Sequence, residues 1–210
     1  MSRGKFITLE GGEGAGKSTQ ARLLASWLEG RGHKVLVTRE PGGSPLAESI
    51  RGLLLLNPQG GPPDALTEAL LFNAARRDHL TRIILPALAA GTQVVCDRFA
   101  DSTRAYQGAG GRLDPGAVDA LERLVVGEAR PDLTCVLDLP VEVGLARAAA
   151  RQSGRDRFEA EDQAFHQRLR EAFLVIAARE PQRCAFIDAR PAPETVSAAI
   201  CEVAASRLGL

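Results

Sequence analysis

The residues best suited to chemistry lie near the start of the chain, in a glycine-rich segment. The segment from Gly11 to Ser18 reads GGEGAGKS and matches the pattern G-x-x-x-x-G-K-[ST] at every fixed position. Glycines let backbone N–H groups turn toward phosphate oxygens, Lys17 can neutralise the outer phosphates, and the Ser18 hydroxyl can bind Mg²⁺. An apolar run, 6–9, precedes the segment and a helical pattern follows it. This order favours a nucleoside triphosphate site over a glycine-rich turn that matches by chance.

Two further polar groups stand at the ends of apolar runs. Asp97 and Arg98 end the run 93–97, where the acid suits indirect Mg²⁺ binding and the arginine can hold a phosphate by a bidentate fork. Arg39 ends the run 35–39, before a turn of Pro41 and two glycines. The structural alternatives are a salt-bridged pair for Asp97 and Arg98, and an exposed turn for Arg39.

An aromatic and a cationic residue share one face of a predicted long helix. Phe72 and Arg76 are four positions apart, so a ring and a guanidinium stand side by side and could stack on and hydrogen-bond to a nucleobase. The spacing alone also fits a core phenylalanine beside a surface arginine.

A basic cluster lies in the last third of the chain. Like charges spaced along one helical face repel each other, which is tolerable where a polyanion arrives to offset them, as in a lid over a triphosphate. Nearby acids leave a salt-bridged, solvated face as the alternative. The cluster consists of Arg147, Arg151, Arg155 and Arg157.

Alternating strand and helix patterns predict an α/β fold that positions these groups. Nearly continuous apolar runs predict strands buried on both faces, as in a parallel sheet, and charged residues end four of the five runs. The predicted strands are 6–10, 35–39, 93–97, 133–139 and 185–188. Helices are predicted after the glycine-rich segment up to Gly30, at 66–90 with a bend near Pro86, and at 115–126, 141–151, 163–179 and 195–208, with loops at 42–43, 57–63 and 108–111.

Composition limits the classes of function. The 210 residues suit a single domain, and equal numbers of basic and acidic residues, 26 each, argue against wholesale nucleic-acid binding. No apolar run approaches a membrane span, and no charged-then-apolar leader opens the chain. The four cysteines lack metal-binding spacing, so we expect reduced thiols and a cytoplasmic protein. The three histidines lack a catalytic setting.

Among nucleotide-binding proteins, a small-molecule kinase fits best. The chain has no guanine-reading N-K-x-D and no D-x-x-G, which a GTP switch would need. Three alternatives remain open: a kinase for another nucleoside monophosphate, a non-enzymatic nucleotide-binding regulator, and, more remotely, a nucleic-acid-bound ATPase.

Several strings together resemble the bacterial thymidylate kinases, from about residue 6 to 188. These strings are LEGGEGAGKST from Leu9, TREPGG from Thr38, LFNAAR from Leu71, DRF from Asp97, STRAYQG from Ser102, RPDL from Arg130, LDL from Leu137 and DRFE from Asp156. The resemblance implies a P-loop NTPase (nucleotide kinase) fold: one domain, 1–210, with a five-stranded parallel sheet flanked by helices and a short Arg-rich lid at about 147–159. It further implies transfer of the ATP γ-phosphate to dTMP in dTTP synthesis, with Mg²⁺, in a homodimer.

The same resemblance assigns roles to single residues. ATP would contact Gly11, Gly12, Glu13, Gly14, Ala15, Gly16, Lys17, Ser18, Thr19 and Arg147, with Mg²⁺ held by Ser18 and Asp97. The dTMP site would consist of Glu13, Arg39, Phe72, Arg76, Arg98, Ser102, Thr103, Tyr106 and Gln107. Some family members place a catalytic arginine at the position of Gly14; others rely on lid arginines. Gly14 puts this chain in the second group, so Lys17, Arg98, Arg155 and Arg157 are the expected catalytic residues.

Overall fold

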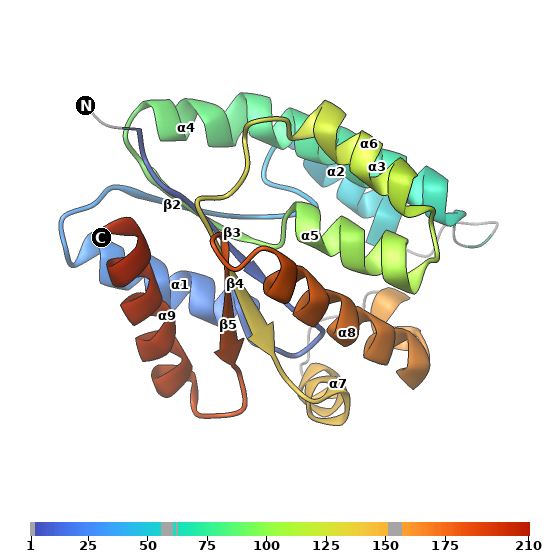
Figure 1. Ribbon diagram of the computed structural model, residues 1–210. Helices are drawn as coiled ribbons and strands as arrows, with labels where there is room; N and C mark the ends of the chain where they lie inside the picture. The colour runs from blue at the N-terminus through green and yellow to red at the C-terminus, as the bar shows by residue number, and fades with distance from the viewer. Residues whose placement is uncertain (1–2, 56–60, 62, 151–156) are drawn as a thin grey trace.

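A five-stranded parallel sheet forms the centre of the molecule (Figure 1). The computed structural model describes residues 3–55, 61, 63–150 and 157–210. The strand order is β2-β3-β1-β4-β5, and every neighbouring pair is parallel. The predicted parallel sheet is confirmed. The central strands β1, β3 and β4 are buried on both faces, whereas the edge strands expose Val37 and Phe186. The strands are β1 Phe6–Glu10, β2 Val35–Arg39, β3 Gln93–Asp97, β4 Leu133–Asp138 and β5 Cys184–Asp188.

The sheet register brings the polar strand ends together. Asp97 on β3 pairs with Leu9 on β1 on one side and with Arg39 on β2 on the other. The glycine-rich segment begins two residues after Leu9, so it shares this edge with Asp97 and Arg39. β1 and β3 are neighbours in the sheet, but the chain leaves β1 toward β2 at one edge and leaves β3 toward β4 on the other side. In parallel sheets, ligands bind at the carboxyl ends of two such strands.

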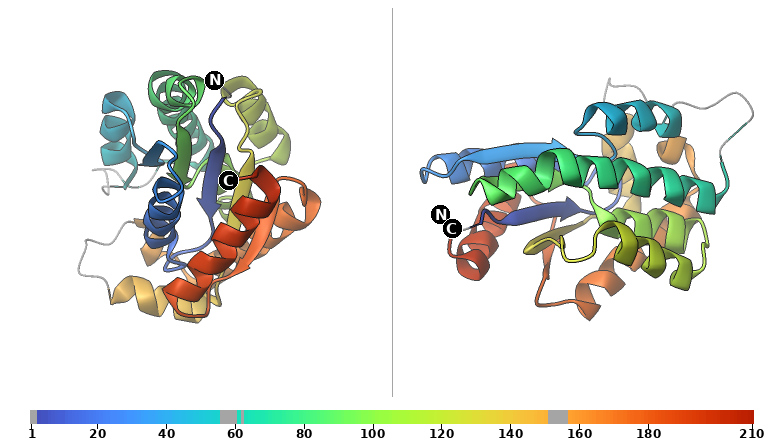
Figure 2. Two further views of the ribbon diagram at one scale, coloured as in Figure 1. Left: turned by 90° about the vertical axis from the view of Figure 1, so that its left-hand side faces the viewer. Right: turned by 90° about the horizontal axis from the view of Figure 1, so that it is seen from above.

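Helices cover both faces of the sheet (Figures 1 and 2). α1 and α9 lie on one face, where Leu24 and Ile200 pack against Ile7 and Leu9 of β1. Leu80, Ile84 and Leu88 pack against β3 on the other face. The helices are α1 Lys17–Glu29, α2 Pro45–Leu55, α3 Ala65–His79, α4 Leu85–Ala89, α5 Ala100–Thr103, α6 Pro115–Val125, α7 Val141–Ala149, α8 Gln163–Arg179 and α9 Pro193–Leu208.

The long helix predicted at 66–90 is continuous but not uniform. α3 runs into a π-helical segment, η1 (Leu80–Ile84), which leads directly into α4. Pro86 has no N–H to donate to the carbonyl four residues earlier, and its ring crowds that carbonyl. A wider π turn before the proline accommodates both effects, so the bend predicted near Pro86 takes the form of a π-helical turn.

Two helical stretches were not predicted. α2 follows the turn at Pro41, and α5 continues into a second π-helical segment, η2 (Arg104–Gly110). The loop predicted at 108–111 is therefore wrong for 108–110. Gly110 packs so close to α8 that a Cβ there would lie 2.6 Å from the Phe165 ring, and this tertiary packing outweighs the helix-breaking tendency of the glycines. A short 3-10 turn, η3 (Arg157–Ala160), was also missed.

Two further properties concern cysteines and membranes. All four cysteines are buried and free, in agreement with the reduced thiols expected from their spacing. Within the described ranges, no helix has the length and apolar character that crossing a bilayer requires.

Candidate active site

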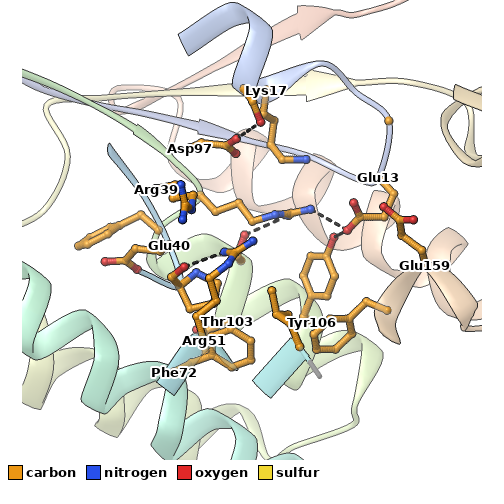
Figure 3. Close-up of a pocket in the computed structure, with 18 of the residues that line it drawn as sticks. Glu13, Lys17, Arg39, Glu40, Arg51, Phe72, Asp97, Thr103, Tyr106 and Glu159 are labelled. Carbon is orange, nitrogen blue, oxygen red and sulfur yellow. Dashed lines mark hydrogen bonds and ion pairs between the residues drawn. The ribbon is translucent and has the colours of Figure 1, made fainter. Parts of the chain in front are cut away.

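A cleft of about 390 Å³ opens at the carboxyl ends of β1, β2 and β3 (Figure 3). Its volume falls in the range of small-molecule sites. The described side chains that line it include more cations than anions, although the whole chain is neutral, so the cleft attracts anionic ligands. The cations are Lys17, Arg22, Arg39, Arg51, Arg76, Arg98 and Arg147, and the anions are Glu13, Glu40, Asp97 and Glu159.

The glycine-rich segment forms a loop that leads into α1. Gly16 has a φ of 89°, a left-handed conformation that suits glycine, and the helix begins at Lys17 with no acidic residue in its first turn. The positive end of the helix dipole therefore points toward the cleft without an acid to neutralise it. The Lys17 Nζ donates hydrogen bonds to the carbonyls of Gly11, at 3.1 Å, and Gly12, at 2.8 Å. Burial and repulsion by Arg98 lower the pKa of Lys17 to about 8.

The loop is in direct backbone contact with α7. Gly14 has a φ of 68°, and a Cβ on it would lie 2.0 Å from the Gly144 carbonyl oxygen. Conversely, a Cβ on Gly144 would lie 2.4 Å from the Glu13 carbonyl oxygen. Both positions therefore require glycine if the backbones of the loop and α7 are to lie this close, and α7 packs directly against the loop.

Ser18 and Asp97 meet at the mouth of the loop. The Ser18 hydroxyl donates a hydrogen bond to Asp97 Oδ2. A hydroxyl and a carboxylate are hard oxygen ligands of the kind that Mg²⁺ prefers, so these residues fit the ion. The described residues contain no group of three or more histidine, cysteine, aspartate or glutamate side chains able to hold a metal by themselves. Mg²⁺ here would complete its shell with water and phosphate oxygens, as is usual for this ion.

Arg98 adopts a left-handed backbone, with a φ of 70°, which is uncommon for a residue with a side chain. The buried Glu10 carboxylate holds the chain that follows: it accepts from Phe99 N at 2.7 Å, and from Ser102 N at 3.3 Å and Ser102 Oγ at 2.7 Å. Burial and the negative charge of Asp101 raise the pKa of Glu10 to about 7. These bonds fix the direction in which Arg98 leaves the strand.

The Arg98 guanidinium lies over the Tyr106 ring, 4.8 Å from its centre, and donates to Glu13 Oε1 at 2.7 Å. The Tyr106 hydroxyl donates to the same Glu13 oxygen at 2.5 Å. Burial opposes the charge of Arg98, but Tyr106, Glu13 and Asp97 outweigh it and raise its pKa above the usual range. Arg98 therefore stays protonated. Its Nη1 donates to the Gly11 carbonyl and to Ser102 Oγ, which connects it to the phosphate loop.

Most N–H groups of the Arg76 guanidinium donate hydrogen bonds to neighbouring residues. Its Nε donates to Glu40 Oε2 at 2.7 Å, its Nη1 to Asn73 and Thr103, and its Nη2 to the Phe99 carbonyl. A guanidinium has five N–H groups, so one N–H of Nη2 is left without a partner among the described residues. Arg76 is buried and lines the cleft, so this N–H is available to a ligand there.

Aromatic rings line the same part of the cleft. Phe72 and Arg76, predicted to share a helix face, both line it. The Phe72 and Phe158 rings are 6.3 Å apart, and Tyr106 meets Phe158 edge-on at 5.2 Å. Such walls accept a flat, uncharged ring. Thr103, Gln107 and Ser102 also line the cleft, and Ser102 Oγ accepts a hydrogen bond from Arg98 Nη1 at 3.3 Å.

Two arginines stand where β2 meets α2. Arg39 lines the cleft, but its Nη2 contacts both Glu48 carboxylate oxygens at 3.1 Å, and its side chain is half exposed. Arg51 was not predicted; it lines the cleft and donates to the Pro41 carbonyl at 2.7 Å. The predicted Arg-Glu-Pro-Gly-Gly turn therefore opens onto the cleft with an additional cation from α2.

The arginines of the predicted lid are separated in the structure. Arg147 lines the cleft and donates to the carbonyls of Ala189 and Arg190. Arg155, expected to be catalytic, lies outside the described residues. Arg157, also expected to be catalytic, is not among the residues lining the cleft. Its Nε donates to the Leu54 carbonyl and its Nη2 contacts Glu68, because a partly buried guanidinium pairs with the nearest carboxylate.

Sequence reasoning missed several side chains that support the site. Glu40 was considered only as part of a turn, yet it is buried and accepts from Arg76 and from His79 Nδ1 at 3.1 Å. Glu159 ends the DRFE string and lines the cleft, a position that the sequence alone does not predict. For Glu68 the sequence offers no local signal, because its partners Gln107 and Arg157 lie 39 and 89 residues away along the chain.

Comparisons with known proteins show which family this chain resembles. The family model described as thymidylate kinase matches residues 9–200. A thymidylate kinase from Caulobacter vibrioides is 58% identical over 210 residues, which is 100% of both chains. One from Bradyrhizobium sp. (strain BTAi1) is 54% identical and covers 98% of this chain and 92% of its own length. The crystal structure of thymidylate kinase from Ehrlichia chaffeensis superposes with a TM-score of 0.77 and 38% identity, over 96% of this chain and 98% of that one.

Proposed function

Because this chain belongs to the thymidylate kinase family, whose members phosphorylate dTMP to dTDP with ATP, we propose that the cleft binds the two nucleotides end to end. ATP lies on the phosphate loop, and dTMP lies between Phe72, Arg76 and Arg98. The observation that carries this proposal is the position of Arg98. Its guanidinium contacts the phosphate loop through the Gly11 carbonyl and the aromatic region through Tyr106, so it stands between the two halves.

On the ATP side, we propose that the chain neutralises charge as the phosphoryl group moves. Lys17 and the α1 N-terminus bind the outer phosphates, and Arg147 packs on the adenine. Ser18 and Asp97 hold Mg²⁺, which supplies further positive charge at the transferring phosphate when it is bound. Arg155 is proposed to contact that phosphate; Arg157 would first have to leave Glu68 and the Leu54 carbonyl. The reaction then depends on positioning and charge neutralisation.

On the dTMP side, the attacking atom is a phosphate oxygen that is already anionic. No strong general base is required, and the chain must instead hold two polyanions close together. Arg98 and Arg39 are proposed to bind the dTMP phosphate, with Arg51 as an additional cation. Phe72 stacks on thymine, Arg76 donates its remaining N–H to a base carbonyl, and Glu13 receives the sugar 3′-hydroxyl. Tyr106 packs under the sugar and disfavours a 2′-hydroxyl.

An assay of ADP release with ATP and Mg²⁺ against five acceptors tests this function. The acceptors are dTMP, dUMP, dCMP, AMP and GMP. Strong preference for dTMP is the expected result. Preference for another monophosphate would retain phosphoryl transfer but contradict the proposed base site. Absence of transfer to every acceptor would favour a nucleotide-binding regulator.

The lowered pKa of Lys17 predicts a pH dependence. The enzyme without ATP loses the Lys17 proton as the pH rises through about 8, and the neutral amine no longer attracts phosphate. We therefore expect kcat/KM for ATP to fall above pH 8, by about tenfold per pH unit. In the complex, bound phosphates stabilise the cation, so kcat should decline only at higher pH. Steady-state kinetics at saturating dTMP measure both curves, and coincident curves would contradict the assignment.

We also propose a homodimer formed through α2, α3 and α6. These helices lie together in Figure 1, and α3 contacts both of the others. All three helices expose leucines to water, and apolar side chains exposed on neighbouring helices are typical of protein interfaces. These leucines are Leu46, Leu53, Leu66, Leu70 and Leu124, each at least 45% exposed.

The Leu70→Glu variant is expected to weaken the dimer. A charge placed on the central helix would be buried without a partner in the dimer but solvated in the monomer. Light scattering coupled to size exclusion should then give the mass of a single chain at micromolar concentration. Val175→Glu is the matched control, because Val175 is 46% exposed on α8, outside this surface. A dimer as stable in Leu70→Glu as in Val175→Glu would contradict this interface.

We propose a cytoplasmic location for the enzyme. Its four cysteines are free and buried, which suits a reducing compartment where ATP is plentiful.

A further inference from the structure

Glu68 joins the cleft to the 3-10 turn η3, and none of the roles proposed above uses it. The residue lies on α3, two helical turns before Arg76, and is 7% exposed. Its carboxylate is contacted from two directions: Arg157 Nη2 meets Oε1, and Gln107 Nε2 lies 3.2 Å from Oε2. One oxygen faces a guanidinium nitrogen and the other faces an amide nitrogen, so both oxygens of Glu68 act as acceptors.

This acceptor-only chemistry decides how the Gln107 amide is oriented. A side-chain amide has a carbonyl oxygen on one side and an NH₂ group on the other, and the two orientations have nearly the same shape. Only the nitrogen can face a carboxylate, because an oxygen there would repel it. Gln107 therefore turns its Oε1 away from Glu68. This oxygen accepts no hydrogen bond from the described residues, and Gln107 lines the cleft.

The oriented amide and Arg76 both line the cleft. Thr103 and Gln107 are four residues apart on the continuous helical stretch of α5 and η2, and Thr103 Oγ1 accepts from Arg76 Nη1 at 3.1 Å. Arg76 has one N–H left for a ligand. The base site thus offers a donor from Arg76 and an acceptor from Gln107 along one edge.

We propose that Glu68 is a positioning residue for base selection: by binding Gln107 Nε2, it presents Gln107 Oε1 to a ring N–H that adjoins a carbonyl. Thymine has this pair, with O4 as acceptor beside the N3–H donor. Cytosine has an amino donor beside an unprotonated N3. Its amino group would face the donor of Arg76, and its N3, an acceptor, would face Gln107 Oε1. The inference rests on the proposed function, because it takes dTMP as the acceptor nucleotide.

The Glu68→Gln variant tests the proposal. Glutamine has the same shape but can present either oxygen or nitrogen, so the Gln107 amide is no longer fixed. The expected result is a fall of about tenfold in the ratio of kcat/KM for dTMP to kcat/KM for dCMP, the effect of one mismatched hydrogen bond. KM for ATP should change by less than about twofold. A folded variant whose dTMP:dCMP ratio equals that of the unchanged enzyme would overturn the proposal.

Two further variants separate orientation from structural support. Arg157→Gln removes the ion pair but leaves the Glu68 carboxylate, so the dTMP:dCMP ratio should be retained. A loss equal to that of Glu68→Gln would assign the effect to the ion pair and overturn the proposal. Gln107→Met removes the carbonyl, and its ratio should fall as in Glu68→Gln, with no further fall in the double variant. Additive losses would overturn the proposal.

The Gln107→Met variant also keeps the test decisive if Glu68→Gln does not fold. An unchanged dTMP:dCMP ratio in Gln107→Met would then overturn the inference by itself. The unchanged enzyme separates this inference from the proposed function. If it shows no preference for dTMP over dCMP, the proposed function fails; if it prefers dTMP and the variants keep that preference, only the role of Glu68 fails.

Discussion

Replacing Arg98 with alanine is expected to lower kcat/KM for dTMP by about 10²–10³-fold and to leave ATP affinity nearly unchanged. Arg98 is held protonated in a buried setting, where a charge acts more strongly on a phosphate than it would in water. Its position is fixed by the Glu10 bonds to the following backbone, so little is lost in orienting it. Steady-state kinetics with dTMP, together with calorimetric titration of a non-hydrolysable ATP analogue, measure the two effects separately.

The left-handed backbone of Arg98 requires a matched control. A residue with a Cβ is strained by roughly 1 kcal/mol at a φ of 70°. Arg98→Ala keeps this strain but loses the guanidinium contacts that hold the backbone, so activity could also fall because the loop shifts. Arg98→Gly removes the guanidinium and the strain together. We expect both variants to lose activity to the same degree. Turnover on dTMP close to that of the unchanged enzyme, in either variant, would show that the guanidinium is not needed.

Replacing Gly144 with alanine is expected to reduce kcat by about 10²-fold, although alanine is the better helix former. A Cβ at this position would lie 2.4 Å from the Glu13 carbonyl oxygen, so either α7 or the phosphate loop must move. A displacement of about 1 Å in groups that hold the transferring phosphate is enough for a loss of this size. Steady-state kinetics with saturating ATP and dTMP measure the effect.

Gly52→Ala provides the comparison for this helix substitution. Gly52 lies inside α2, and a Cβ there would meet nothing within 4 Å. This variant should keep its activity and gain up to about 1 kcal/mol in the free energy of unfolding. Equal activity of Gly144→Ala and Gly52→Ala would mean that the contact between α7 and the loop has no catalytic role.

The strands could be predicted almost to the residue because each is a short apolar run bounded by charge or by a turn. The prediction of the last strand, 185–188, differs from β5 only by Cys184. The stretch from Arg104 to Gly110 could not be predicted in the same way. Its glycines favour a loop locally, and only packing against Phe165 and Leu169, some sixty residues away, makes it helical.

The residues of the candidate site differ in the same way: some could be predicted from spacing within one segment, and others depend on contacts with distant residues. The phosphate loop and the pair Phe72 and Arg76 were predictable, because each depends on spacing within one segment. The partners that immobilise Arg76 were not, since Glu40 and Thr103 are 36 and 27 residues away from it. The pairing of Arg157 with Glu68 bridges 89 residues, so its sequence neighbourhood suggested a phosphate contact instead.

The cations of the cleft stand in both of its halves. Lys17 follows the phosphate loop, Arg39 and Arg51 stand where β2 meets α2, and Arg98 lies between the two halves. ATP and dTMP together carry the same total charge as ADP and dTDP, because one phosphoryl group only changes its carrier. A surface that is positive at both ends therefore stabilises the substrate pair and the product pair to a similar degree. Such a catalyst is reversible, and the relative concentrations of the four nucleotides decide in which direction the phosphate moves.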